Sequence, residues 1–252
     1  MPLPKSFIIA SLLGLCLLGN PLQAGEVRLS VAANFIDAAR EIASLFEEEC
    51  GHTTLISYGS TGKLYAQIEH GAPFHVFLSA DRLRAVKAEE EGLAVAGSHF
   101  VYALGRLVLW SLKPERFENG EDFLRQGELA HLAVANPKTA PYGLAARQTL
   151  QHLDLQQRLT PKLVQGDSIA QTFQFVATGN ADAGFVALAQ IKGWEGESGT
   201  LWEIPDEYHA PIEQAAVLLN KGSDNPAAVD FFEFLRSDTA REVIERYGYG
   251  AE

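Results

Sequence analysis

Small residues with hydroxyl or amide side chains stand just ahead of several predicted amphipathic helices in this chain. In the stretch SYGSTGKLYAQI, residues 57–68, Ser60 and Thr61 lie beside two glycines, and Lys63 is the only charged side chain nearby. A helix N-terminus offers free backbone N–H groups and a partial positive charge, so it binds anions without a basic side chain. Such a stretch predicts either an ordinary helix cap or one wall of an oxyanion site.

Similar chemistry precedes the first predicted helix. Ala33 and Asn34 follow an apolar run, and Asn34 with Asp37 three residues later has the spacing of an N-cap pair. This start and the one at Ser60 both fall in the N-terminal part of the chain.

Two further helix starts follow in the second half of the chain. Tyr142 stands in a turn with two prolines at residues 137–143, and Ser168 with Gln171 fits the capping box S-x-x-Q ahead of a helix that begins at Ile169. In open α/β sheets the loops at the carboxyl ends of strands gather at one crevice, where ligands bind. The four starts together therefore predict donors that surround a small oxyanion.

A site built only of neutral donors prefers an oxyanion in one protonation state. It avoids the desolvation cost of buried charges, and it suits a fully deprotonated dianion because a protonated oxyanion brings a hydrogen that needs an acceptor. Asp167 is the one carboxylate close to the predicted site, and we expect it to face solvent or to hold its loop.

Short β-like runs alternate with these helices, which predicts an α/β architecture with parallel βαβ units. In the first helix Phe35, Ala39, Ile42 and Phe46 form the apolar stripe of a helix on a sheet. The predicted strands are 27–31, 54–57, 76–78, one long strand over 101–110, 132–134, 184–186 and 215–219.

The long strand and the acidic stretch 202–208, interpreted as an exposed return connection, suggest two lobes. Residues 25–104 with 208–252 form lobe one in this interpretation, and residues 105–207 form lobe two.

The N-terminal segment predicts export. Lys5 precedes an apolar run over residues 7–18, and the small residue Ala24 follows, so residues 1–24 are expected to be a signal peptide. No later run is long and apolar enough for a membrane helix, and the formal net charge of −12 disfavours nucleic acid and anionic membranes as partners.

After removal of the expected signal peptide, Cys50 is the only cysteine left, so no intramolecular disulfide is expected. A lipid anchor on Cys16 is the alternative to free export.

Several motifs resemble the periplasmic molybdate-binding proteins of bacterial ABC importers over almost the whole chain. They include SVAANFIDAAREIASLF, YAQIEHGAPF, FLSAD and NPKTAPYG, in this order. The resemblance implies a two-lobed periplasmic binding protein fold with type II connectivity and a ligand cleft between the lobes. It also implies a periplasmic monomer that captures molybdate or tungstate and delivers it to the permease subunits, with no cofactor and with the metal bound only as its oxyanion.

The resemblance implies a set of ligand residues at the same four helix starts. They are Ala33 and Asn34, Thr61 with Ser60 beside it, Tyr142, and the backbone of Ile169 after Ser168. Many members of the family carry a tyrosine ligand where this chain has Ala187, so the phenol donor is expected to have moved to Tyr142.

Two alternatives stay open. An exported enzyme would need catalytic motifs, but the nucleophile elbow G-x-S-x-G is absent because Tyr58 stands two residues before Ser60, and no H-E-x-x-H occurs. The same fold with another ligand, such as sulfate, phosphate or an organic acid, is not excluded, because function depends on the site and not on the fold.

Overall fold

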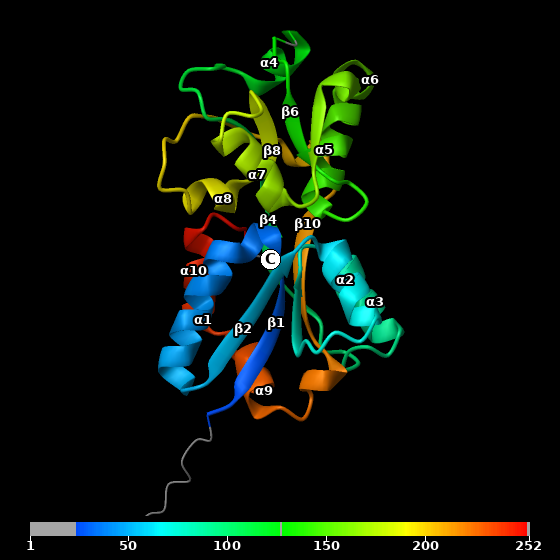
Figure 1. Ribbon diagram of the computed structural model, residues 1–252, viewed down its shortest axis with the longest axis vertical. Coiled ribbons are helices and arrows are strands. Elements are labelled where there is room, and N and C mark those ends of the chain that lie inside the picture. Colours follow the sequence, from blue (N-terminus) through cyan, green and yellow to red (C-terminus); the bar gives the residue numbers. More distant parts are fainter. Residues whose placement is uncertain (1–23, 127, 251–252) are drawn as a thin grey trace, which may run out of the picture.

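The computed structural model describes residues 24–126 and 128–250, so nearly all of the predicted signal peptide lies outside the described residues. The chain forms two lobes, one above the other in Figure 1, each built around a five-stranded sheet. Lobe one contains β1 (Glu26–Ala32), η1 (Ala33–Phe35), α1 (Ile36–Cys50), β2 (Thr53–Gly59), α2 (Thr61–Glu69), β3 (Val76–Ser79), α3 (Arg82–Glu90), β4 (Phe100–Gly105), β10 (Ile212–Leu218), η4 (Asn220–Gly222), α9 (Pro226–Phe234) and α10 (Asp238–Arg246).

Lobe two is formed by the middle of the chain. It contains β5 (Leu107–Ser111), α4 (Gly120–Gln126), β6 (Leu132–Ala135), α5 (Pro141–His152), α6 (Gln156–Leu159), η2 (Thr160–Lys162), β7 (Leu163–Gly166), α7 (Ile169–Ala177), β8 (Ala183–Ala187), α8 (Leu188–Lys192) and β9 (Thr200–Glu203). A short 3-10 helix, η3 (Asp206–Tyr208), lies on the return to lobe one.

The two sheets share one topology. The strand orders are β2-β1-β3-β10-β4 and β7-β6-β8-β5-β9, so each sheet has three parallel strands followed by two antiparallel pairings. This is the expected two-lobed α/β fold with type II connectivity. Parallel strands place their carboxyl ends, and the helix starts that follow them, on the same edge of each sheet.

Helices cover both faces of the first sheet because each has one apolar side. The predicted stripe on the first helix is confirmed: Phe35, Ala39, Ile42 and Phe46 are all buried and pack with α9 and α10 on one face. On the opposite face, α2 and α3 bury a second cluster that includes Leu64 and Phe77.

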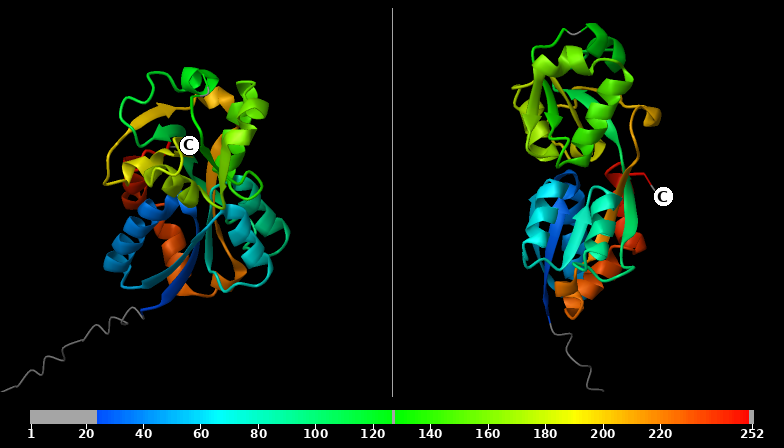
Figure 2. Two further views of the ribbon diagram at one scale, coloured as in Figure 1. Left: turned by 45° about the horizontal axis from the view of Figure 1, so that its top comes forward. Right: turned by 90° about the vertical axis from the view of Figure 1, so that its right-hand side faces the viewer.

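The crossing between the lobes differs from the sequence prediction. The single strand expected over 101–110 is wrong: β4 ends at Gly105 in the first sheet, and β5 begins at Leu107 in the second. The β-forming sequence continues through Arg106, but the pairing partner changes from β10 to β8 and β9. The right-hand view of Figure 2 shows this crossing and the return to β10 along one side of the molecule.

The return connection was also interpreted incorrectly at its start. Residues 200–203 are β9, which pairs with β5, so Trp202 and Glu203 belong to the second sheet. Strand β7 was missed as well. Both are edge strands of four residues with little apolar alternation, which leaves almost no pattern to detect.

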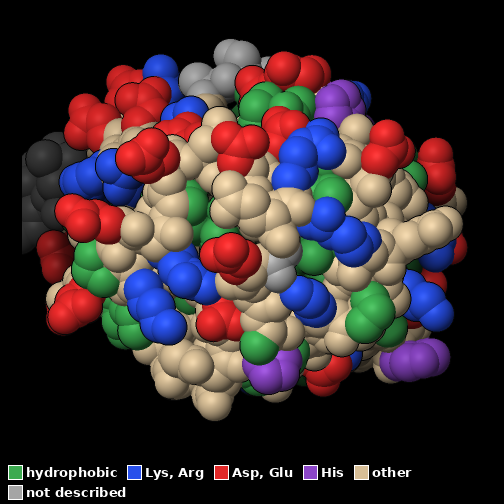
Figure 3. All heavy atoms as spheres, turned by 90° about the horizontal axis from the view of Figure 1, so that it is seen from above, with side chains coloured by type: hydrophobic (Ala, Val, Ile, Leu, Met, Phe, Trp, Pro, Cys, Tyr) green, Lys and Arg blue, Asp and Glu red, His purple; other side chains and the backbone are tan. Residues whose placement is uncertain are grey.

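The surface of lobe two carries both signs of charge. Seen from that end, acidic and basic side chains are interspersed (Figure 3). None of the helices in residues 24–126 and 128–250 has the length and apolar character to cross a membrane.

Candidate functional site

The four helix starts meet where the lobes face each other. The N–H of Gly62, in the first turn of α2, donates to the carbonyl oxygen of Thr139 in lobe two at 2.8 Å. One apolar cluster contains Ala33 from lobe one together with Tyr142 and Ile169 from lobe two. The structure therefore brings residues from all four starts to one interlobe region.

Ser60 and Thr61 begin α2 at this region, and both are buried. Ser60 occupies the N-cap position, yet its side chain makes no capping bond and its Oγ has no hydrogen-bond partner among the described residues. Thr61 Oγ1 accepts from the N–H of Ala80 at 3.1 Å, which leaves the Thr61 hydroxyl hydrogen free to be donated. Neither hydroxyl serves as an ordinary cap.

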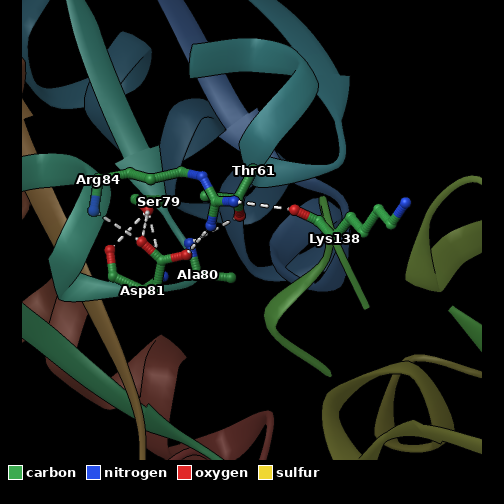
Figure 4. Close-up of polar contacts among 6 residues, drawn as sticks. All are labelled: Thr61, Ser79, Ala80, Asp81, Arg84 and Lys138. Atoms are coloured by element: carbon green, nitrogen blue, oxygen red, sulfur yellow. Dashed lines mark hydrogen bonds and ion pairs between the residues drawn. The ribbon is translucent and has the colours of Figure 1, made fainter. Parts of the chain in front are cut away.

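A charged bridge lies beside Thr61 (Figure 4). Asp81 caps α3 by accepting from the N–H of Arg84 at 2.8 Å, and it pairs with the Arg84 guanidinium. Arg84 Nη2 also donates to the carbonyl oxygen of Lys138 in lobe two at 3.2 Å. This bridge joins the lobes next to the donors, while its charges are matched within lobe one.

Asn34 has a different role from the predicted cap. It lies inside η1, and the side chain of Asn34 does not cap η1 or α1. Its Nδ2 donates to Gln214 Oε1 at 2.6 Å and to Tyr249 Oη at 3.2 Å, and Tyr249 Oη donates to the Asn34 carbonyl at 2.8 Å. With its amide hydrogens directed into lobe one, Asn34 keeps the backbone N–H of a helix start as its donor toward the cleft.

Tyr142 supplies the phenol from lobe two. Its side chain is 1% exposed in the first turn of α5, and its hydroxyl has no partner among the described residues. Burial raises the pKa of Tyr142 well above its ordinary value, and the nearby Tyr249 and Tyr102 phenols raise it further. The hydroxyl therefore stays protonated and can donate at any physiological pH.

The start of α7 completes the set. Ser168 Oγ accepts from the N–H of Gln171 at 3.3 Å, as predicted, but Gln171 Oε1 accepts from Asp167 N and not from Ser168 N, so only half of the capping box forms. Ile169 is the first residue of α7, where a backbone N–H has no acceptor within the helix.

Asp167 does not direct its charge at the donors. Its carboxylate is 72% exposed and pairs with Lys63 Nζ at 2.8 Å, across the two lobes. This agrees with the expectation that it faces solvent.

Buried polar atoms without a partner are expensive, at about 1–3 kcal/mol each, and are uncommon in folded proteins. In the described part of the chain, four of them lie on segments that meet at this region: Ser60 Oγ, Thr139 Oγ1, Tyr142 Oη and Gln214 Nε2. The sequence prediction missed Thr139 and Gln214. The available signal for Gln214 was a glutamine directly before the apolar run over residues 215–218.

A groove of about 530 Å³ adjoins this region at Ala33 and Asn34. It lies between the start of α1 and helices α7 and α8, and its lining includes Ala33, Asn34, Arg40, Ala170 and Trp194. Within residues 24–126 and 128–250, no group of three or more His, Cys, Asp or Glu side chains is arranged to hold a metal ion. The unpartnered donors at the interlobe region are neutral, whereas the groove beside them also carries the charged side chains of Asp37 and Arg40.

Two lobes of this topology, with unpartnered donors facing each other across the junction, define a binding protein that holds its ligand between lobes. The chain belongs to the bacterial extracellular solute-binding protein family, whose model matches residues 27–250.

Named relatives and a solved structure agree with this assignment. The chain is 50% identical to the molybdate-binding protein ModA of Azotobacter vinelandii over 95% of this chain and 96% of that protein. It is 49% identical to ModA of Rhodobacter capsulatus over 97% and 94%. The solved structure of an Azotobacter vinelandii periplasmic molybdate-binding protein superposes with a TM-score of 0.86 at 39% identity, covering 90% of this chain and 99% of that one.

Proposed function

We propose that this protein binds the molybdate dianion, and tungstate, between its lobes and delivers it to an ABC importer. The observation that carries the proposal is the set of buried, neutral and unpartnered donors from both lobes, which includes Ser60 Oγ and Tyr142 Oη. A tetrahedral dianion offers four oxygen acceptors and no hydrogen, so it satisfies such donors without leaving an unmatched group. The relatives named as molybdate-binding proteins support the choice of ion.

The proposed contacts are those predicted from the sequence. Lobe one provides Ser60, Thr61 and the backbone at Ala33 and Asn34. Lobe two provides the Tyr142 phenol and, at the N-terminus of α7, Ser168 and Ile169.

Binding is coupled to lobe closure in this proposal. The lobes are those expected from the sequence, residues 25–104 with 208–252 and residues 105–207, apart from Gly105, which ends β4 in the first sheet. They move about the two crossings. Because the anion contacts both lobes, it binds the closed arrangement more tightly than the open one, and that difference in affinity drives closure. The importer then recognises the closed form, which acts as a monomer in the periplasm after residues 1–24 are removed.

The alternatives differ in ligand or in class. The relatives are named as binding proteins and not as enzymes, which supports capture without a chemical step. A sulfate-binding protein from Mycobacterium tuberculosis has a TM-score of 0.70 at only 14% identity, and this likeness shows the fold alone. Sulfate therefore remains a ligand to be tested.

Titration calorimetry of the purified protein with molybdate, tungstate, sulfate and phosphate tests the proposal. We expect molybdate and tungstate to bind tightly. Phosphate carries a proton near neutral pH, and an unmatched buried proton costs about 1–3 kcal/mol, or roughly 5- to 150-fold in affinity. Sulfate lacks a proton but is smaller, so equal affinity for sulfate and molybdate would refute selection by size.

The ion pair between Lys63 and Asp167 gives a prediction about closure. It forms only when the lobes meet, and an exposed pair contributes about 0.2–1 kcal/mol. Lys63→Ala and Asp167→Ala are each expected to weaken molybdate binding up to about fivefold, mainly through faster dissociation, and less so at high salt.

The charge-reversed double variant, Lys63→Asp with Asp167→Lys, is expected to restore most of the loss. Lys138→Ala is a matched control, because the Lys138 carbonyl and not its side chain makes the interlobe contact. Stopped-flow dissociation rates at low and high salt measure the effect. If the reversed pair binds no better than the single variants, the ion pair does not stabilise the closed form.

A further inference from the structure

Gln214 presents an unexplained donor at the edge of the candidate site. It lies on β10 with 0% exposure, directly before the apolar residues 215–218 of the strand. Its Oε1 accepts from Asn34 Nδ2 at 2.6 Å and from Tyr102 Oη at 3.3 Å. Its Nε2, which carries two hydrogens, has no partner in the described part of the chain.

The bonds to Oε1 decide which way the amide is turned. Asn34 Nδ2 can only donate, so the Gln214 atom that meets it has to be the amide oxygen and not the nitrogen, and the Tyr102 hydroxyl can donate to the same oxygen. The Tyr249 hydroxyl uses its single hydrogen to donate to the Asn34 carbonyl, so it can only accept from the Asn34 side chain. The Asn34 atom on this side is therefore the amide nitrogen. The Gln214 nitrogen is consequently a donor without an acceptor at hydrogen-bond distance among the described residues, although the Tyr249 phenol lies near enough to interact with the Gln214 side chain.

A second free donor comes from the other lobe to the same place. The Tyr142 hydroxyl lies against Gly105 and beside Ile212, which pair with each other between β4 and β10, and Ile212 stands two residues before Gln214 on the same strand. The Tyr249 and Tyr102 phenols lie near enough to raise the pKa of Tyr142 beyond the effect of its burial. Those two tyrosines belong to the cluster that holds Asn34 and Gln214. One donor from each lobe thus borders a single buried polar cluster, and an oxyanion oxygen is an acceptor that both can use.

We propose that Gln214 is a specificity-determining contact of the bound oxyanion, donating from Nε2 on the strand that carries the chain back to lobe one. This inference rests on the proposed function and extends its ligand set to a residue outside the four helix starts. A fixed donor at this place favours an oxyanion without a proton. A carboxylate here would instead provide an acceptor for one.

Gln214→Glu is the sharpest test because it retains an Oε1 for Asn34 and Tyr102 and replaces only the free NH₂ by oxygen. At pH 8 we expect its affinity for molybdate to fall at least about tenfold. Molybdate binding to this variant is also expected to take up a proton, since the new carboxyl must be protonated to donate. Calorimetry with molybdate in two buffers of different ionisation enthalpy measures both quantities.

Gln214→Met removes the donor without adding charge, and we expect about a tenfold loss of affinity without proton uptake. Glu213→Gln, the reverse exchange at the neighbouring and partly exposed position of β10, is the matched control and should bind as the wild type does. Thermal unfolding without ligand is measured for each variant, because a purely structural role lowers stability but produces no proton uptake.

The outcomes separate the two proposals. Wild-type affinity for molybdate in both Gln214→Glu and Gln214→Met would overturn the assignment of Gln214. A loss of affinity matched by lost stability, without proton uptake in Gln214→Glu, would also overturn it. Failure of the wild-type protein to bind molybdate would instead refute the proposed function.

Discussion

Replacing Gly62 by Ala or Val is expected to weaken molybdate binding about 10- to 100-fold while each lobe stays folded. A Cβ on Gly62 would lie 3.0 Å from the Cα and 3.2 Å from the carbonyl oxygen of Thr139, which are backbone atoms of the other lobe. Overpacking of this kind costs about 1–3 kcal/mol. The third close atom, Arg84 Nη2 at 3.1 Å, belongs to lobe one but is the end of a flexible side chain that can move aside. The cost therefore falls mainly on the closed form, and Val is expected to have the larger effect.

Gly62→Ala is expected to raise the stability of the unliganded protein while it lowers the affinity for molybdate. Gly62 lies in the first turn of α2 and has no positive φ, so Ala is compatible with its backbone. Gly-to-Ala exchange at such a site stabilises a folded chain by about 0.4–1 kcal/mol. Calorimetry gives the affinity and thermal unfolding without ligand gives the stability. Unchanged affinity in Gly62→Val would show that binding does not require this approach of the lobes.

Gly105→Ala is expected to weaken molybdate binding by about 1–3 kcal/mol through Tyr142. A Cβ on Gly105 would overlap the Tyr142 hydroxyl oxygen and lie 3.0 Å from both Tyr142 Cζ and Ile212 Cγ2. The ring of Tyr142 is almost fully buried and cannot turn away freely. Its hydroxyl would therefore be displaced from the position in which it donates.

A double-mutant cycle isolates this effect. Tyr142→Phe alone is expected to cost about 1–2 kcal/mol of binding free energy, the value of a buried hydrogen bond to a charged ligand. Adding Gly105→Ala to Tyr142→Phe should then cost clearly less than Gly105→Ala does alone, because no hydroxyl is left to displace. Calorimetry on the four proteins measures the coupling. Strictly additive losses would show that Gly105 does not act through the phenol.

Much of the fold followed from local patterns. The apolar stripe on α1, the alternation of strands and helices, and the start of α7 at Ile169 agree with the structure. Helices α2 and α5 begin at Thr61 and Pro141, inside the stretches expected to precede them, so Tyr142 lies in the first turn of a helix and not in a turn before it. These features depend on residues close together in the chain, so periodicity and capping residues reveal them. The crossing at Arg106 could not be predicted in this way, because only the choice of pairing partner distinguishes one long strand from two.

The candidate site also has a part that local sequence predicts and a part that it does not. Its helix starts were predictable, whereas the true partners of Asn34 are Gln214 and Tyr249, which lie 180 and 215 positions away in the sequence. A local N-cap bond to the first turn was the simpler expectation, and tertiary contacts replaced it. Direct contact between these residues and the anion stays a prediction that the variants above will test.

The position of β10 has a consequence for how the chain is made. It lies between β3 and β4, yet it is synthesised after every strand of lobe two, so the first sheet cannot be completed until the last quarter of the chain is available. Lobe two, which is continuous in sequence, meets no such delay. The order of synthesis thus keeps the first sheet incomplete for longest, a useful property under the proposed export, in which the polypeptide crosses a membrane before it folds.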